Sequence, residues 1–144
     1  MLFCDLSQTF LMKISFSHFL CKFAVEIRLN IIYMETADER LKALSELHED
    51  WDDEGALPIC PLVLQHAKSL IDAANDMDLA HWNLFPAING TLTFLHENKD
   101  AMLSIGEDDF SFVFASEGRI VKAIDNAPFS IAEILELIKL VNIN

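Results

Sequence analysis

Tight-turn signals divide the second half of the chain into short segments. From Trp82 apolar and polar residues alternate, and Asn89-Gly90 is a dipeptide typical of a tight turn. Further turn signals lie at residues 98–100, at residues 106–109 and at Glu117-Gly118. Short alternating segments joined by tight turns are typical of an antiparallel meander. The four strands that we expect contain Leu92, Phe94 and His96, then residues 101–105, then Phe110, Phe112 and Phe114, and finally residues 120–124.

A helix is expected well before these strands. Thr36 and Glu39 have the spacing of a capping box, in which the threonine hydroxyl accepts from the third helical amide and the glutamate reaches back. The helix that follows places Leu41, Leu44 and Leu47 on one side. These three leucines therefore predict the first apolar face of the fold.

Two further helices complete the pattern. Pro61 is suited to the first turn of a helix, and Ser130 with Glu133 forms a second capping box near the end of the chain. We predict an α+β fold with two N-terminal helices, a four-stranded antiparallel meander and a C-terminal helix (ααββββα), the helices packing on one face of the sheet. The apolar stripe of the second helix is Val63, Ala67, Leu70, Ile71 and Ala74.

The composition changes near residue 33. Residues 1–33 hold five of the eleven phenylalanines but no glycine or proline, and their scattered charges leave no apolar run long enough for a membrane span. They also lack the cleavage site of a secretory signal. Alternation over residues 19–31 predicts a half-buried strand. Residues 1–33 are also rich in amino acids with A/T-rich codons, and we hypothesise that the natural protein starts at Met34. We expect residues 34–144 to form a single α+β domain.

The chain is strongly acidic. Its formal net charge is −13, and residues 1–33 hold only three of the ten basic and two of the 23 acidic residues, so residues 34–144 carry −14. This balance disfavours direct binding to nucleic acid, where lysine and arginine must replace counterions. It favours solubility, a basic partner, or both. Cys4, Cys21 and Cys60 fit no zinc or redox spacing, so a reducing cytoplasm is the simplest compartment.

An acidic turn separates the first two helices. It places a large apolar side chain among carboxylates, and a glycine and a proline then prevent the helix from continuing. We predict that Trp51 fills the core beneath the turn and that Asp52 or Asp53 accepts hydrogen bonds from local backbone amides. The turn consists of Asp50, Trp51, Asp52, Asp53 and Glu54, and its structural positions are Trp51, Gly55 and Pro58.

The first half of this turn matches a calcium-binding loop. Asp50, Asp52, Glu54 and Gly55 occupy positions 1, 3, 5 and 6 of an EF-hand loop, but position 12, which needs a bidentate acid, is Pro61. Because the bidentate acid at position 12 contributes strongly to calcium affinity and is missing here, we expect no metal ion and no other cofactor.

Catalytic motifs do not emerge from the remaining residues. The five histidines form no HExxH pair, and the four glycines form neither a Walker loop nor a GxGxxG motif. A GxSxG nucleophile elbow is absent. Cys60 precedes a helix, but we expect a helix cap or a partly buried thiol. We therefore assign no catalytic residue. The histidines are His18, His48, His66, His81 and His96.

Residues 41–106 resemble a loose group of small, largely uncharacterised bacterial proteins. The shared pattern is a leucine helix, a Trp-Asp-x-x-Gly-Ala-x-Pro-Ile turn, a second helix and a strand pair. The chain differs at Asp53-Glu54, where the group often has glycine and an aromatic residue, and at His96-Glu97. The resemblance implies an antitoxin-like or immunity-like role and no catalytic residue. The matching residues are Leu44, Leu47, Trp51, Asp52, Gly55, Ala56, Pro58, Ile59, Ala67, Pro86, Gly90, Leu92, Leu103 and Ile105.

These observations favour a small, cytoplasmic, non-enzymatic protein-binding module whose partner is a basic protein. The residues expected to bind the partner are Asp50, Trp51, Asp52, Asp53 and Glu54. One alternative is a metal-dependent hydrolase that uses these carboxylates with a histidine. Another is a nucleic-acid mimic, in which rows of carboxylates imitate phosphates. Membrane attachment through residues 1–33 is a further alternative.

Overall fold

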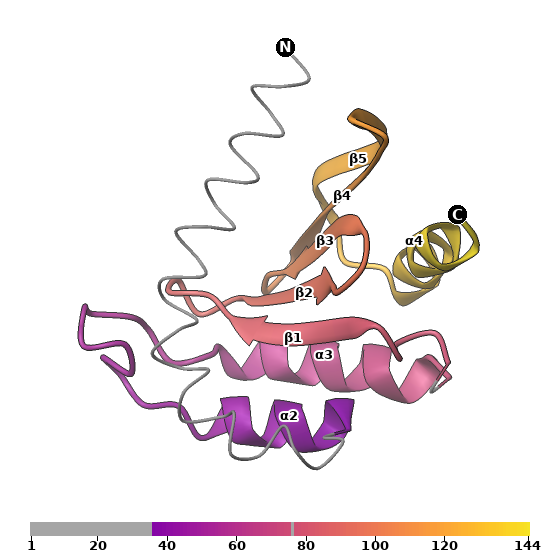
Figure 1. The fold of residues 1–144 in the computed structure, drawn as a ribbon. Helices are drawn as coiled ribbons and strands as arrows, with labels where there is room; N and C mark the ends of the chain where they lie inside the picture. The colour runs from indigo at the N-terminus through magenta and orange to yellow at the C-terminus, as the bar shows by residue number, and fades with distance from the viewer. Residues whose placement is uncertain (1–35, 76) are drawn as a thin grey trace.

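The computed structural model describes residues 36–75 and 77–144 (Figure 1). Two helices, α2 (Ala37–Ser45) and α3 (Pro61–Ala73), precede a sheet, and a third helix, α4 (Ile131–Ile143), follows it. The sheet contains β1 (Trp82–Pro86), β2 (Leu92–His96), β3 (Asp100–Ile105), β4 (Asp109–Ser116) and β5 (Arg119–Pro128). The described part of the chain is thus α+β. The strand expected over residues 19–31 lies outside the described residues.

The sheet has five strands, so the prediction of four was wrong. The strands follow one another as β1-β2-β3-β4-β5, and each pairs antiparallel with the next. The additional strand is β1, whose Trp82 pairs with His96 and whose Pro86 pairs with Leu92. It is only five residues long and ends in a proline, which cannot donate to a ladder and is confined to edges and strand ends. Its sequence signal is therefore weak.

Two of the expected turns are formed by left-handed residues. In the β1–β2 turn, Gly90 has φ +85° and its amide donates to Ala87 O at 3.2 Å. In the β4–β5 turn, Glu117 and Gly118 both have positive φ (52° and 75°), as a two-residue hairpin turn requires. These dipeptides therefore fix where the strands reverse.

The helix starts follow local capping. Thr36 Oγ1 accepts from Glu39 N at 3.2 Å, and Thr36 N donates to Glu39 Oε2 at 3.0 Å, which is the expected capping box. At α4, Ser130 Oγ accepts from Glu133 N at 3.4 Å. Helix α2 ends at Ser45, so Leu47 lies beyond it rather than on its apolar face.

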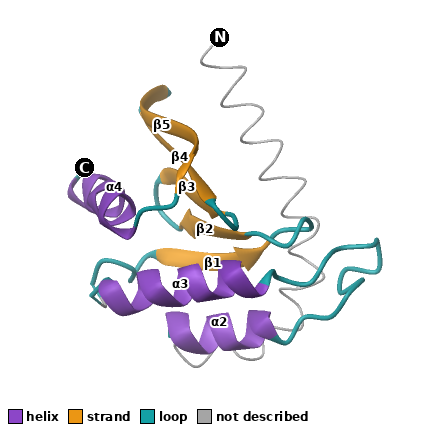
Figure 2. Cartoon of the chain, turned by 180° about the vertical axis from the view of Figure 1, so that it is seen from behind, coloured by secondary structure: helices purple, strands orange, loops and turns teal. Residues whose placement is uncertain are grey.

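One face of the sheet packs against the helices. Figures 1 and 2 show α2 and α3 alongside β1, with α4 at the opposite side of the molecule from the loop that joins α2 and α3. Along β3 and β4 alternate side chains are buried, as period-two packing on one face requires. The buried strand residues include Ala101, Leu103, Ile105, Phe110, Phe112 and Phe114, and the buried helix residues include Leu44, Val63, Leu70, Ile134 and Ile138.

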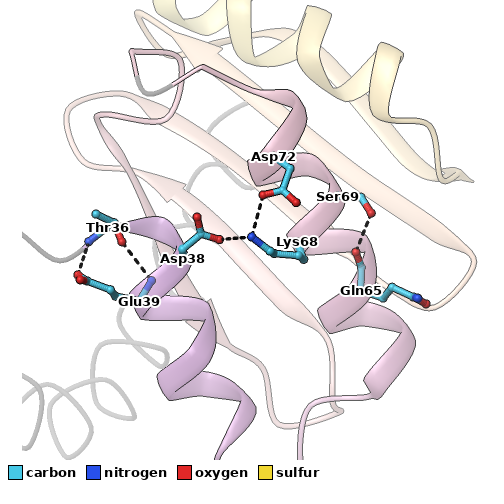
Figure 3. Close-up of polar contacts among 7 residues, drawn as sticks. All are labelled: Thr36, Asp38, Glu39, Gln65, Lys68, Ser69 and Asp72. Carbon is cyan, nitrogen blue, oxygen red and sulfur yellow. Dashed lines mark hydrogen bonds and ion pairs between the residues drawn. The ribbon is translucent and has the colours of Figure 1, made fainter.

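Polar contacts join α2 to its neighbours. Lys68 Nζ on α3 lies 2.8 Å from Asp38 Oδ1 on α2 and 2.8 Å from Asp72 Oδ1 on α3 (Figure 3). These two carboxylates raise the pKa of Lys68 to about 12. On the other side of α2, Arg40 Nε donates to Leu84 O at 2.9 Å, and this bond occupies a carbonyl of the edge strand β1.

Among the helices of residues 36–75 and 77–144, none is both long enough and apolar enough to cross a membrane. Attachment through residues 1–33 concerns residues outside that range.

Candidate functional site

The acidic loop, residues 46–60, connects α2 to α3 and is folded on itself. Asp50 N donates to Ala56 O at 2.7 Å, and Asp53 N donates to Asp50 O at 3.0 Å. Asp50 and Asp53 have positive φ (63° and 62°), as does Gly55 (89°). Aspartate tolerates this left-handed conformation better than most residues because its short side chain bonds to nearby backbone groups. The residue types of the turn are therefore those that its backbone requires.

Two of its carboxylates hold the loop together. Asp50 Oδ1 accepts from Gly55 N at 2.6 Å. Asp52 Oδ1 accepts from Glu54 N and from Ala56 N, each at 2.9 Å. The predicted role of Asp52 as an acceptor of local amides is confirmed, while Asp53 and Glu54 remain exposed side chains on the outside of the turn.

Trp51 does not fill the core beneath the turn, contrary to prediction. Its indole is half-buried, and Nε1 donates to Leu57 O at 2.9 Å. The buried side chains of this loop are Ala56 and Ile59, which are 2% and 5% exposed. The indole N–H needs an acceptor, and the loop backbone supplies one at its surface, so the ring lies along the loop.

The loop docks on the β1–β2 turn. Leu57 N donates to Ile88 O at 2.9 Å, and Cys60 N donates to Gly90 O at 3.0 Å. A β-carbon at Gly90 would stand only 3.0 Å from Pro58 O. Glycine at this position therefore allows the backbone of the loop to approach the turn closely.

A third segment joins the same end of the sheet. Cys60 Sγ donates to Glu107 Oε1 at 3.0 Å, which places the β3–β4 turn beside the start of α3. We call this region the acidic end; it comprises residues 46–60, 87–91 and 106–108. None of these three segments contains lysine or arginine, whereas Glu107 and Asp108 add exposed carboxylates to those of the loop. Nothing in the sequence indicates that the end of the acidic loop at Cys60 would meet Glu107.

Exposed apolar side chains also gather there. Leu57 is 51% exposed and Ile88 is 56% exposed, and the Leu57–Ile88 backbone hydrogen bond makes them neighbours. They were not among the expected site residues, because each stands alone in its own sequence context. Docking of the loop brings Ile88 to Leu57, in the same loop as the exposed Asp53 and Glu54.

The geometry speaks against a calcium site in the loop. Asp50 and Asp52 direct an oxygen at amides of the loop itself, so these oxygens do not converge on an ion. In the described part of the chain, no three His, Cys, Asp or Glu side chains are grouped so that they could hold a metal ion.

His66 and His81 make their ring contacts with residues outside the acidic loop. His81 Nδ1 is 2.6 Å from Glu97 Oε1, just before β1 begins and therefore at the opposite end of the sheet. The hydrogen bond from His81 lowers the pKa of Glu97. His66 stacks on Phe129 with a centroid separation of 4.0 Å. The structure thus does not bring either imidazole to Asp50, Asp52 or Glu54.

Comparison with protein families, with curated proteins and with solved structures gives no match to this chain. Functional inference consequently rests on the geometry of the acidic end.

Proposed function

We propose that this protein is a non-enzymatic binding module that binds a basic protein through its acidic end, in the manner of an antitoxin or immunity protein. The observation that carries this proposal is that the exposed Leu57–Ile88 apolar pair and the exposed carboxylates of Asp53 and Glu54 belong to the same acidic end, whose segments contain no lysine or arginine. Exposed apolar side chains with a polar rim are typical of protein interfaces.

The folded state of the loop favours tight binding. Its backbone is held by its own hydrogen bonds and by Asp50 and Asp52, so little conformational entropy is lost when a partner docks. The exposed carboxylates then act mainly on the encounter, since a surface of one sign attracts a partner of the opposite sign and accelerates association.

The Leu57–Ile88 pair contributes mainly to the affinity for the partner. Burial of side chains such as Leu57 and Ile88 at the centre of an interface supports affinity, whereas rim charges mainly determine the association rate and its salt dependence. The partner that fits is a protein segment with an apolar side chain surrounded by lysine or arginine.

The proposal is tested by affinity capture from the native host, with the tagged chain and mass spectrometry of the bound proteins. The variant Asp53→Asn/Glu54→Gln removes two exposed charges and leaves the amide acceptors Asp50 and Asp52 in place. The control Glu117→Gln/Glu136→Gln removes two exposed charges on the β4–β5 turn and on α4.

A basic protein that is bound by the original chain and by the control, and that is lost or weakened at the acidic-loop variant, is the expected result. An empty capture, or equal recovery with both variants, contradicts the proposal.

A further inference from the structure

His96 accepts two backbone hydrogen bonds at the end of β2. Its Nδ1 lies 3.1 Å from Asn98 N and 3.1 Å from Lys99 N, and the residue is 8% exposed. Both backbone groups are donors, so Nδ1 must be the unprotonated nitrogen and the neutral ring carries its hydrogen on Nε2. The β2–β3 turn is therefore held by two hydrogen bonds to the lone pair of Nδ1, and protonation of Nδ1 would remove this acceptor.

The neighbours of His96 hold the end of α4. Trp82 meets the imidazole edge to face with a centroid separation of 5.2 Å, and its Nε1 donates to Asn142 Oδ1 at 3.3 Å. Lys99, which belongs to the turn closed by His96, donates from Nζ to Val141 O. The turn and the indole thus both bind the last turn of α4.

We propose that His96 is an acid-sensitive latch, whose protonation opens the β2–β3 turn and thereby releases the C-terminal turn of α4. A proton on Nδ1 would point an N–H group at the N–H groups of Asn98 and Lys99. Both hydrogen bonds are then lost, and the two part-buried backbone amides are left facing an N–H group instead of an acceptor. Lys99 is displaced with the turn, so Val141 O loses its partner.

The groups around His96 determine the pH at which its imidazole becomes protonated. Burial lowers the pKa of His96 below 6.5, Lys99 and His81 lower it further, and Glu97 opposes them. The α4 residues at the latch, Val141 and Asn142, do not titrate. Because the folded state disfavours the proton, the stabilisation is complete above pH 6.5 and declines as the pH falls from 6.5 towards the lowered pKa.

Amide exchange followed by NMR on the full chain tests the latch. Between about pH 7.5 and 5, after correction for intrinsic exchange, we expect protection of the Asn98 and Lys99 amides to fall about tenfold or more, together with that of the α4 amides after residue 139. The imidazole signals of His96 report its protonation in the same samples.

The variant His96→Asn is the matched control, since Oδ1 of asparagine occupies nearly the position of Nδ1, accepts backbone amides and does not titrate. Its turn should keep its protection across the whole range. A second variant, His81→Gln, removes the neighbouring imidazole and should retain the effect. Equal loss of protection in His96→Asn overturns the proposal, as does a turn that stays protected while His96 is protonated, or an imidazole that remains neutral at about pH 5.

Discussion

Gly90 lies directly against Pro58: a β-carbon on the glycine would stand 3.0 Å from the proline carbonyl oxygen and 3.7 Å from Cys60 N. This approach lets the acidic loop form its backbone hydrogen bonds to the β1–β2 turn. The loop is thereby held against the sheet although it contains no regular secondary structure of its own.

Gly90→Ala should destabilise the fold by about 2–3 kcal/mol, because the substitution adds steric crowding to a left-handed backbone. Gly118→Ala separates the two contributions. Gly118 has φ +75° with no atom near its prospective β-carbon, so only the backbone cost of about 1 kcal/mol remains. Urea unfolding of both variants measures the difference. A Gly90→Ala variant no less stable than Gly118→Ala would contradict the close approach.

Asp52 is expected to act through its oxygen rather than its charge. Asp52→Ala removes the acceptor of the Glu54 and Ala56 amides and should cost about 1–2 kcal/mol. Asp52→Asn retains an oxygen in the same place and should cost less than half as much. Denaturant unfolding of the two variants is the measurement, and equal losses would show that the charge itself matters.

Leu103 and Met102 are neighbours on β3 that face opposite sides of the sheet. Leu103 is fully buried, whereas Met102 is partly exposed. Leu103→Ala should therefore cost about 2–5 kcal/mol through the cavity that it leaves, and Met102→Ala clearly less. Thermal or urea unfolding distinguishes them. A reversed order would mean that the core lies on the other face of the sheet.

Lys68 is expected to make a small, salt-dependent contribution. Lys68→Met removes the ion pair that joins α3 to Asp38 on α2 and the pair with Asp72 within α3. It should lower Tm slightly at low salt, with little effect at about 1 M NaCl, where charges are screened within about 3 Å. Since the pKa of Lys68 is raised from 10.5 to about 12, its contribution is complete below pH 10.5 and disappears as the pH rises through about 12. Lys139→Met, on the exposed side of α4, is the control. Equal Tm changes in the two variants at low salt would contradict a specific role for Lys68.

Local sequence patterns predict the structure correctly where neighbouring residues alone determine it. The capping box of Thr36 and Glu39 and the turns at Gly90 and Gly118 depend on contacts within a few residues, and each is present. The sequence does not predict strand β1 because it is only five residues long and ends in a proline, and its pairing with β2 supplies most of what makes it a strand. The prediction that Trp51 fills the core was wrong because a large apolar side chain indicates burial but does not indicate which part of the molecule covers it.

The sequence by itself determined the α+β class, the helix starts, the reversal points of most strands and the acidic character, because each of these depends on residue type or short spacing. Only the tertiary structure decided which acids became structural acceptors and which stayed exposed. It also decided that Leu57 would lie beside Ile88, that Cys60 would meet Glu107, and that Lys99, in the turn closed by His96, would contact α4. These relationships join residues far apart in the chain, and docking of the loop, turns and last helix on one sheet creates them.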